Sequence, residues 1–177
     1  MEKVQHGKIV TDTIYPQIPS FIFINQDSQR VTNKTFAQKI YVSSFFFTAC
    51  LTICPKMKTQ LLRVYKQFKN NNQVGLLSHT LDPGRDSVAA LREYAHRLGV
   101  ASTKWHFVTG SKDSIYAIAS KYMVSATKAD QKTGGVVHSG AFVLVDANRQ
   151  VRGIYDGTKP EKVEALLADI GILLAEK

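Results

Sequence analysis

The sequence predicts a single α/β domain in which helices flank a central mixed sheet. Two observations predict it. Strand-like and helix-like segments alternate along most of the chain, and one early strand is apolar without interruption, as expected when both of its faces are covered. The 177 residues fit one domain with a substantial core, and the 44% hydrophobic and 21% charged fractions are those of an ordinary globular protein.

A hairpin and a central strand open the domain. Residues 21–24 and 29–32 flank a polar turn and predict a short hairpin. Residues 40–47 end in three consecutive phenylalanines and predict an interior strand. Apolar residues at helical spacing predict the next helix, which Pro55 opens because a first-turn residue needs no N–H partner. Asparagines at 70–72 end this helix.

The alternation of strands and helices then continues and ends with a second hairpin. Residues 74–80 predict a strand, and the following helix is capped by Asp86 or Ser87 and stopped by Gly99. The remaining elements are a strand at 105–108, a helix at 115–122, a hairpin of strands 141–146 and 151–155, and a last helix opened by Pro160. Right-handed crossovers place helices on both faces of the sheet. This is the outline of a thioredoxin-like sandwich with an N-terminal hairpin extension.

Hydropathy indicates whether a segment of the chain could span a membrane. The longest apolar runs, at 45–47 and 166–174, are far shorter than the roughly 18 residues that span a bilayer, so no membrane span is predicted. Residues 1–4 lack the apolar core of an export signal. We therefore expect residues 1–14 to be a tail that once led to an anchor, and residues 15–177 to form the domain.

The net charge of +9 would suit a nucleic acid, an anionic membrane surface or an acidic protein. Five basic residues and no acid stand between positions 56 and 69, but no RNP-like or helix-turn-helix pattern accompanies them. Nucleic acid is therefore not an expected partner. The plain interpretation of this run is a solvated helix face, and an acidic docking partner is the alternative.

The only two cysteines, Cys50 and Cys54, stand where the central strand meets the following helix. One helical turn apart, their Cα atoms would be on the order of 6 Å from each other, within disulfide range. The helix N-terminus is expected to lower the pKa of both thiols. Two cysteines are too few for a network of disulfides that stabilises the fold. There are therefore three alternatives for the pair: it alternates between a dithiol and a disulfide, it chelates a soft metal, or it is buried and inert.

A metal site needs further ligands, and five histidines are the candidates. Three of them have no feature that indicates a ligand: His6 is in a tail, His96 is on the polar side of a helix, and His106 is on a short strand. His79 lies on the same face of its strand as its apolar neighbours, so we expect a core histidine. It is kept as the second candidate for the third ligand. His138 follows two glycines and precedes the final hairpin, which approaches the cysteine loop in a thioredoxin-like sheet. We therefore expect His138 to be the third ligand.

Two thiolates and one imidazole favour copper. Soft sulfur ligands select Cu(I), and a mixed sulfur and nitrogen set also holds Cu(II). Structural zinc would need a fourth protein ligand. The chain has no HExxH or deaminase-type signature for a catalytic zinc, and no glycine-rich phosphate loop.

Three segments, taken in order, resemble the Sco/SenC family of copper-delivery proteins, which assist assembly of the copper centre of cytochrome c oxidase. Residues 45–57 are similar to its CxxxCP motif, residues 81–86 to its DPxRD segment, and residues 138–146 to its histidine-to-strand segment. The similarity covers about residues 15 to 175. Many members have proline after the first cysteine, where this chain has Leu51, which frees the loop and leaves the ease of disulfide formation open.

The resemblance implies a thioredoxin-like fold and copper held by Cys50, Cys54 and His138. It also implies an extracytoplasmic domain, on the periplasmic side, that an anchor outside this chain tethers to a membrane. The implied partner is a copper-accepting oxidase subunit or another copper chaperone. Asp82 is a candidate for fixing the loop behind the ligands, with capping of its own turn as the alternative.

A second hypothesis is an enzyme, a thiol-disulfide reductase that uses Cys50 and Cys54 as its redox dithiol. Three intervening residues instead of two argue against efficient turnover, as does His138, which simple exchange does not require. It stays open whether one protein carries out both copper delivery and the reduction of target cysteines. A thiol peroxidase would want its threonine three residues before the reactive cysteine, whereas Thr48 is two before Cys50.

Overall fold

The computed structural model describes residues 2–5, 8–11, 15–51, 53–122, 127–130, 135–137 and 140–176. Seven strands form the main sheet: β3 (Ile22–Asn25), β4 (Arg30–Thr32), β5 (Ile40–Phe46), β6 (Val74–Thr80), β7 (Trp105–Thr109), β10 (Ala141–Val145) and β11 (Val151–Asp156). The helices are η1 (Asn33–Phe36), α1 (Cys54–Phe68), α2 (Val88–Leu98), α3 (Lys112–Lys121) and α4 (Pro160–Ala175). Two short pairs complete the described elements: β1 (Glu2–Gln5) with β2 (Lys8–Thr11), and β8 (Thr127–Asp130) with β9 (Gly135–Val137).

The main sheet has the strand order β11-β10-β5-β6-β7-β3-β4. Strands β5, β6 and β7 are parallel, whereas β10 joins β5, and β3 joins β7, in antiparallel pairs. Strand β5 therefore has a partner on each side, and all seven of its residues are buried. The prediction of an interior strand here is confirmed, as is the N-terminal hairpin of β3 and β4.

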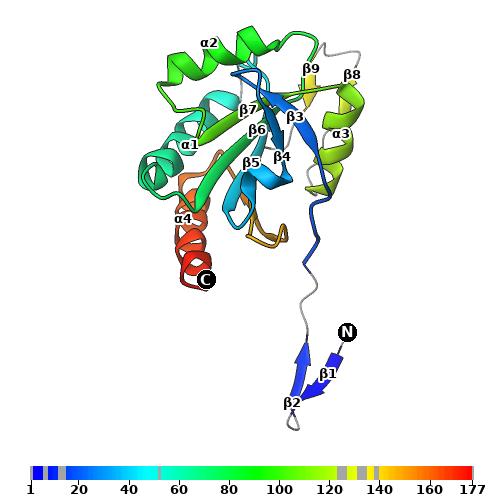
Figure 1. The fold of residues 1–177 in the computed structure, drawn as a ribbon, viewed down its shortest axis with the longest axis vertical. Helices are drawn as coiled ribbons and strands as arrows, with labels where there is room; N and C mark the ends of the chain where they lie inside the picture. The colour runs from blue at the N-terminus through cyan, green and yellow to red at the C-terminus, as the bar shows by residue number, and fades with distance from the viewer. Residues whose placement is uncertain are drawn as a thin grey trace.

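Helices cover both faces of the sheet (Figure 1). One core contains buried residues of α1, α2 and α4, and the other contains buried residues of α3 together with the β3–β4 hairpin. Alternate residues of β5 enter the two cores, with Val42 and Phe46 on the first side and Tyr41 and Phe45 on the second. The mixed sheet between helices confirms the predicted thioredoxin-like α/β fold.

Local chemistry accounts for the helix ends. Pro55 stands in the first turn of α1, as predicted. The cap of α2 is Ser87, whose Oγ accepts a hydrogen bond from the Ala90 backbone N–H at 3.2 Å. Gly99 ends α2 in the left-handed conformation, with φ at 68°. Because Ser87 caps the helix, the carboxylate of Asp86 is available for another role.

The short pairs β1–β2 and β8–β9 are elements that the sequence pattern did not predict. Each strand has three or four residues, which is too short for strand periodicity to stand out. The division of the chain at residues 14 and 15 stays a prediction. Within the described residues, no helix is both long and apolar enough to cross a bilayer.

Candidate functional site

The two cysteines meet at the carboxyl end of the parallel strands. Cys50 follows β5 in a short loop, where its N–H donates to the Phe47 carbonyl at 3.1 Å, and Cys54 is the first residue of α1. Both side chains are buried, with 9% and 6% of their surface exposed, and a hydrogen bond joins the two thiols. The prediction that Cys54 lies at the start of the helix is confirmed. The structure therefore places a close, reduced dithiol at the end of the interior strand.

The pKa of Cys54 is raised well above its usual value, first by burial and then by the hydrogen bond with Cys50. A backbone hydrogen bond from Phe47 acts in the opposite direction. The expectation that the helix N-terminus lowers the pKa of both thiols is therefore wrong for Cys54. Desolvation disfavours the thiolate and outweighs the backbone hydrogen bond that favours it.

Asp86 is the carboxylate that fixes the cysteine loop. It is fully buried and accepts hydrogen bonds from the Thr48 N–H at 3.0 Å, from the Thr48 hydroxyl, and from the Thr80 hydroxyl at 2.7 Å. Thr48 lies between β5 and Cys50, while Thr80 is the last residue of β6. One carboxylate thus joins the segments that leave two neighbouring strands.

Asp82 contributes in a different way. Its backbone carbonyl accepts hydrogen bonds from the N–H groups of Arg85 at 3.1 Å and Asp86 at 2.8 Å, which close the turn. Its carboxylate lies 3.8 Å from the exposed Arg85 side chain. The bridge to the cysteine loop therefore belongs to Asp86, which the sequence analysis considered only as a helix cap. Its position four residues past Asp82 in the DPxRD-like segment was the available signal.

Tyr94 is a second neighbour of the dithiol that the sequence analysis did not single out. It packs between Phe46 and Phe107, with ring centroids 5.2 and 5.4 Å away. Burial raises the pKa of its phenol first, and the nearby Cys54 and Cys50 raise it further. The available signal was its place one helical turn after Leu91, on the apolar face of α2.

His138 lies outside the described residues, as does His6. The chain is described again from Gly140, which stands against the beginning of α1. A Cβ atom on Gly140 would lie 3.5 Å from Ile53 Cδ1 and 4.0 Å from Met57 Sδ, and these two residues flank Cys54 in the sequence. The chain at Gly140 therefore lies against the cysteine end of α1.

His79 is a core histidine, on the opposite face of the sheet from the thiols. Its ring stacks on Phe45 with centroids 4.6 Å apart, and Phe45 belongs to the core that contains α3. Its Nδ1 lies 3.2 Å from the Ser44 carbonyl, while its Nε2 has no hydrogen-bond partner among the described residues. Burial lowers its pKa to about 4. This placement removes the second candidate from the thiol site.

The arrangement suits a soft metal ion with a small number of protein ligands. Two thiols in contact can both bind one ion after losing their protons, and thiolates prefer Cu(I) over hard cations. No group of three or more His, Cys, Asp or Glu side chains that could hold a metal occurs within the described part of the chain. A third His, Cys, Asp or Glu ligand for Cys50 and Cys54 would therefore come from residues outside that part.

Comparison with known proteins identifies relatives of the whole domain. The sequence model of the SCO1/SenC family matches residues 12–174. A SCO1/SenC family lipoprotein from Bacillus anthracis has a similar crystal structure, with 26% identity, a TM-score of 0.82, and coverage of 91% of this chain and 96% of that one.

Two further solved structures are similar at 27% identity. One is BsSco, described as a member of the Sco family of cytochrome c oxidase assembly proteins with a disulfide switch, at a TM-score of 0.77 and coverage of 92% and 95%. The other is Arabidopsis thaliana ScoI with copper bound, at a TM-score of 0.73 and coverage of 90% and 98%. With the family match extending over nearly all of the domain, the chain belongs to the SCO1/SenC family.

Proposed function

We propose that this protein binds one copper ion through Cys50, Cys54 and His138 and delivers it to the copper centre of cytochrome c oxidase, or prepares the cysteines of that centre. The observation that carries the proposal is the buried, hydrogen-bonded dithiol at the start of α1. The copper-bound structure of a relative at 27% identity supports the choice of metal.

The geometry around Gly140 supports His138 as the third ligand. Gly140 contacts the beginning of α1, and two residues of chain reach at most about 7 Å. A residue two positions before Gly140 has the reach to contribute a ligand at the helix turn that carries Cys54, which supports the choice of His138. An imidazole adds a nitrogen donor, which Cu(II) prefers more strongly than Cu(I) does.

Each side chain then has a separate task. The thiolates of Cys50 and Cys54 supply most of the affinity for Cu(I), and their protons leave when the metal binds. The raised pKa of Cys54 keeps its thiol protonated at neutral pH in the reduced, metal-free protein, so copper uptake is accompanied by proton release. Asp86 keeps the loop that carries Cys50 attached to β6.

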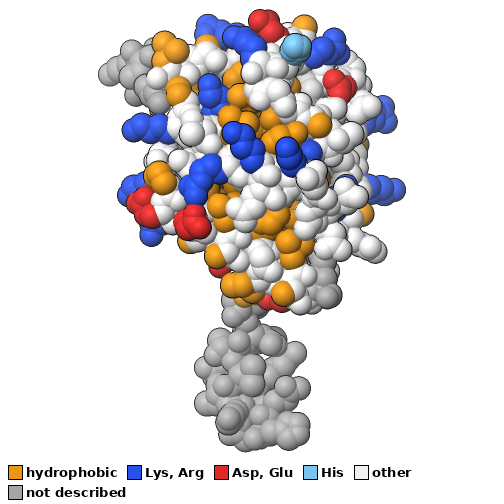
Figure 2. Space-filling model, turned by 90° about the vertical axis from the view of Figure 1, so that its left-hand side faces the viewer, with side chains coloured by type: hydrophobic (Ala, Val, Ile, Leu, Met, Phe, Trp, Pro, Cys, Tyr) orange, Lys and Arg blue, Asp and Glu red, His pale blue; other side chains and the backbone are white. Residues whose placement is uncertain are grey.

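A copper-accepting oxidase subunit or another copper chaperone is the expected partner on the extracytoplasmic side, and a membrane anchor outside this chain is part of the same proposal. The B. anthracis relative is a lipoprotein, which supports this placement. Figure 2 shows lysine and arginine side chains spread over one face of the molecule with few acids among them. Within the basic run of α1, Arg63 pairs with Glu164 of α4 at 2.6 Å, whereas Lys56, Lys66 and Lys69 are exposed.

A second function, thiol-disulfide exchange by Cys50 and Cys54, is favoured by the contact between the two thiols. The disulfide switch described for BsSco supports the ability of such a pair to close. The raised pKa of Cys54 argues against rapid turnover, because the thiolate is the attacking species. We therefore place copper binding first.

Metal titration tests the proposal. The reduced protein is titrated with Cu(I) against a competing chelator, and separately with Cu(II), in wild type, Cys54→Ser, His138→Ala and His96→Ala. Cys54→Ser should lose tight Cu(I) binding because only one thiolate is left. His138→Ala should lose Cu(II) binding far more than Cu(I) binding, since two thiolates still hold Cu(I). His96→Ala removes an exposed histidine of α2 and should match wild type.

Two outcomes would contradict the assignment. If His138→Ala binds both oxidation states like wild type, the third ligand is another group. If wild type binds neither Cu(I) nor Cu(II) but reduces insulin disulfides at a rate that Cys54→Ser abolishes, thiol-disulfide exchange replaces copper binding as the function.

A further inference from the structure

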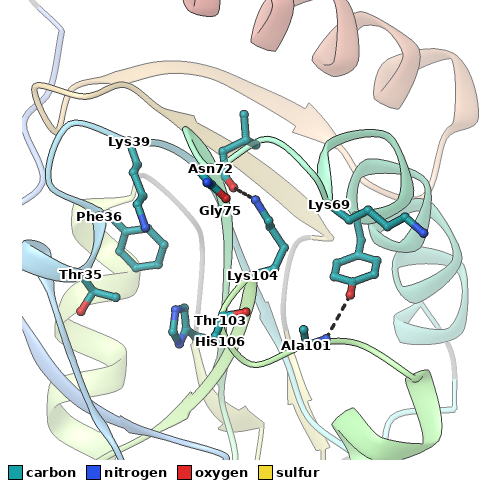
Figure 3. Close-up of a pocket in the computed structure, with 12 residues that line it drawn as sticks. Thr35, Phe36, Lys39, Lys69, Asn72, Gly75, Ala101, Thr103, Lys104 and His106 are labelled. Carbon is teal, nitrogen blue, oxygen red and sulfur yellow. Dashed lines mark hydrogen bonds between the residues drawn. The ribbon is translucent and has the colours of Figure 1, made fainter.

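A second concave site lies at the end of the sheet opposite to the cysteines. A cavity of about 320 Å³ opens where β5, β6 and β7 begin (Figure 3). Cys50 follows the other end of β5. Phe36 of η1 and Tyr65 of α1 are among its walls, and Gly75 of β6 is part of its lining. The volume is large enough for a phosphate-sized group with its nearest water molecules.

Positive charge dominates this cavity. Lys39, Lys69 and Lys104 line it, and no carboxylate does so among the residues that the structure describes. Lys39 is half-buried, and its ammonium group has no ion pair or hydrogen bond with the described residues. In Figure 3 Lys69 extends away from the other two lysines, so Lys39 and Lys104 are the cations that face the cavity.

Lys104 is held in place by the backbone. Its Nζ donates to the Val74 carbonyl at 2.7 Å and to the Asn71 carbonyl, and the residue is 9% exposed. An ammonium group has three N–H donors, so one is left after these two bonds. Burial lowers the pKa of Lys104, and the charge of Lys39 lowers it further. A nearby anion would relieve both effects.

His106 adds a third donor. The Oδ1 atom of Asn25 accepts the N–H groups of Asp27 and Gln29, each at 2.9 Å, so its Nδ2 is the atom that donates to His106 Nδ1 at 3.2 Å. Because Nδ1 is an acceptor, the neutral imidazole carries its proton on Nε2 and offers an N–H there. Burial and the charge of Lys39 lower the pKa of His106 to about 4, while Asp27 acts in the opposite direction.

We propose that this cavity binds a phosphate-type oxyanion between Lys39, Lys104 and His106. The site combines two ammonium groups and an imidazole N–H around a cavity that no described carboxylate lines, which matches the donors that phosphate oxygens accept. The phosphate group can come from free inorganic phosphate or from a phospholipid headgroup. Because the cysteines lie at the other end of β5, this binding is independent of the proposed copper function.

The direct test is a phosphate titration followed by amide NMR shifts and by the thermal midpoint of unfolding, at constant ionic strength with chloride as the comparison anion. Wild type should show saturable shifts at Gly75 and Ala101, and its thermal midpoint should rise with phosphate. Lys39→Gln should weaken binding on the order of tenfold, the loss of one charged hydrogen bond. Lys112→Gln removes the same charge from the exposed start of α3 and should bind like wild type.

A second arm separates the two sources. Vesicles of phosphatidylcholine with phosphatidylglycerol are compared with phosphatidylcholine alone in a flotation assay on the same three proteins. Phosphate binding that depends on Lys39 identifies the free anion, and vesicle binding that depends on Lys39 identifies the headgroup; either supports the site. Equal behaviour of Lys39→Gln and Lys112→Gln in both arms would overturn it. Copper stoichiometry should be the same in all three proteins, so failure here leaves the proposed function untouched.

Discussion

Asp86 positions the loop that leads from β5 to Cys50. Its buried carboxylate accepts three hydrogen bonds, two from Thr48 beside the cysteine loop and one from Thr80 at the end of β6. A buried carboxylate with this many donors stabilises the segment because its removal leaves the donors without partners. The cysteine loop is therefore positioned from a strand next to the one that carries it.

Replacement of this carboxylate should destabilise the protein. We expect Asp86→Ala to lower the free energy of unfolding by about 3 kcal/mol, because two part-buried donors of Thr48 and one buried donor of Thr80 lose a charged acceptor. Asp82→Ala is the matched control and should cost less than about 1 kcal/mol, since the Asp82 carboxylate lies only near the exposed Arg85 at 3.8 Å. Urea unfolding of both variants measures the difference. Equal losses in the two variants would show that Asp86 does not have this role.

The dithiol should close into an intramolecular disulfide on mild oxidation. Cys50 and Cys54 already share a hydrogen bond, so bond formation requires little movement elsewhere. Leu51, with 89% of its surface exposed, makes few contacts that would resist a change in the loop. Thiol counting before and after oxidation checks this, with Cys50→Ser as the control that cannot close. Two free thiols surviving in a folded, metal-free protein would contradict it.

At the scale of elements, the start of α1 is a junction of three segments. It receives the cysteine loop from β5, and the glycine that precedes β10 packs against its first turn. Gly140 adopts a φ of 72°, where a side chain is disfavoured, and its carbonyl accepts the Gly157 N–H at 2.8 Å. A side chain there would strain the backbone and press on Thr158.

Gly140 and Gly99 form a matched pair for a test of this junction. Both have positive φ, but Gly99 lies in open space at the end of α2. We expect each substitution by alanine to lower the free energy of unfolding by about 1 kcal/mol, from backbone strain. Only Gly140→Ala should also weaken Cu(II) binding, because it displaces the chain two residues after His138. Chemical unfolding and Cu(II) titration of both variants check this; equal Cu(II) affinities would separate the junction from the metal site.

Across the whole molecule, the two cores on either side of the sheet contain different titratable side chains. The core with α1, α2 and α4 contains both thiols, whereas the core with α3 surrounds His79. Burial holds His79 neutral, with its pKa lowered to about 4 from an ordinary 6.5. The histidine side of the sheet therefore contributes a pH dependence of stability that is separate from copper binding.

The direction of this dependence follows from proton uptake. Below pH 6.5 the unfolded chain protonates His79 while the folded protein does not, so stability is complete above pH 6.5 and falls as the pH drops toward 4. The contribution of His79 is on the order of 3 kcal/mol over this range. Urea unfolding at pH 7 and pH 4.5 should show a smaller fall for His79→Gln than for wild type. An identical fall in both proteins would argue against a neutral buried imidazole.

The sequence by itself determined the strands of the main sheet, the α-helices α1 to α4 and their order, because these depend on local rules. The apolar run at residues 40–47 predicted the interior strand, Pro55 the start of α1, and Gly99 the end of α2, and all three are confirmed. Strand burial, helix opening and left-handed helix ends are properties of a few neighbouring residues. The proximity of Cys50 and Cys54 was predictable for the same reason, since only three residues separate them in the chain.

Only the tertiary structure decided which distant residues meet. Thr48 and Asp86 are 38 positions apart, and their contact arises because β5 and β6 are adjacent in the sheet. The side of the sheet that His79 occupies and the raised pKa of Cys54 also depend on packing, since burial is set by elements far away in the chain. The basic cavity gathers Lys39 and Lys104 from separate loops in the same way, because parallel strands bring their amino ends together at one edge.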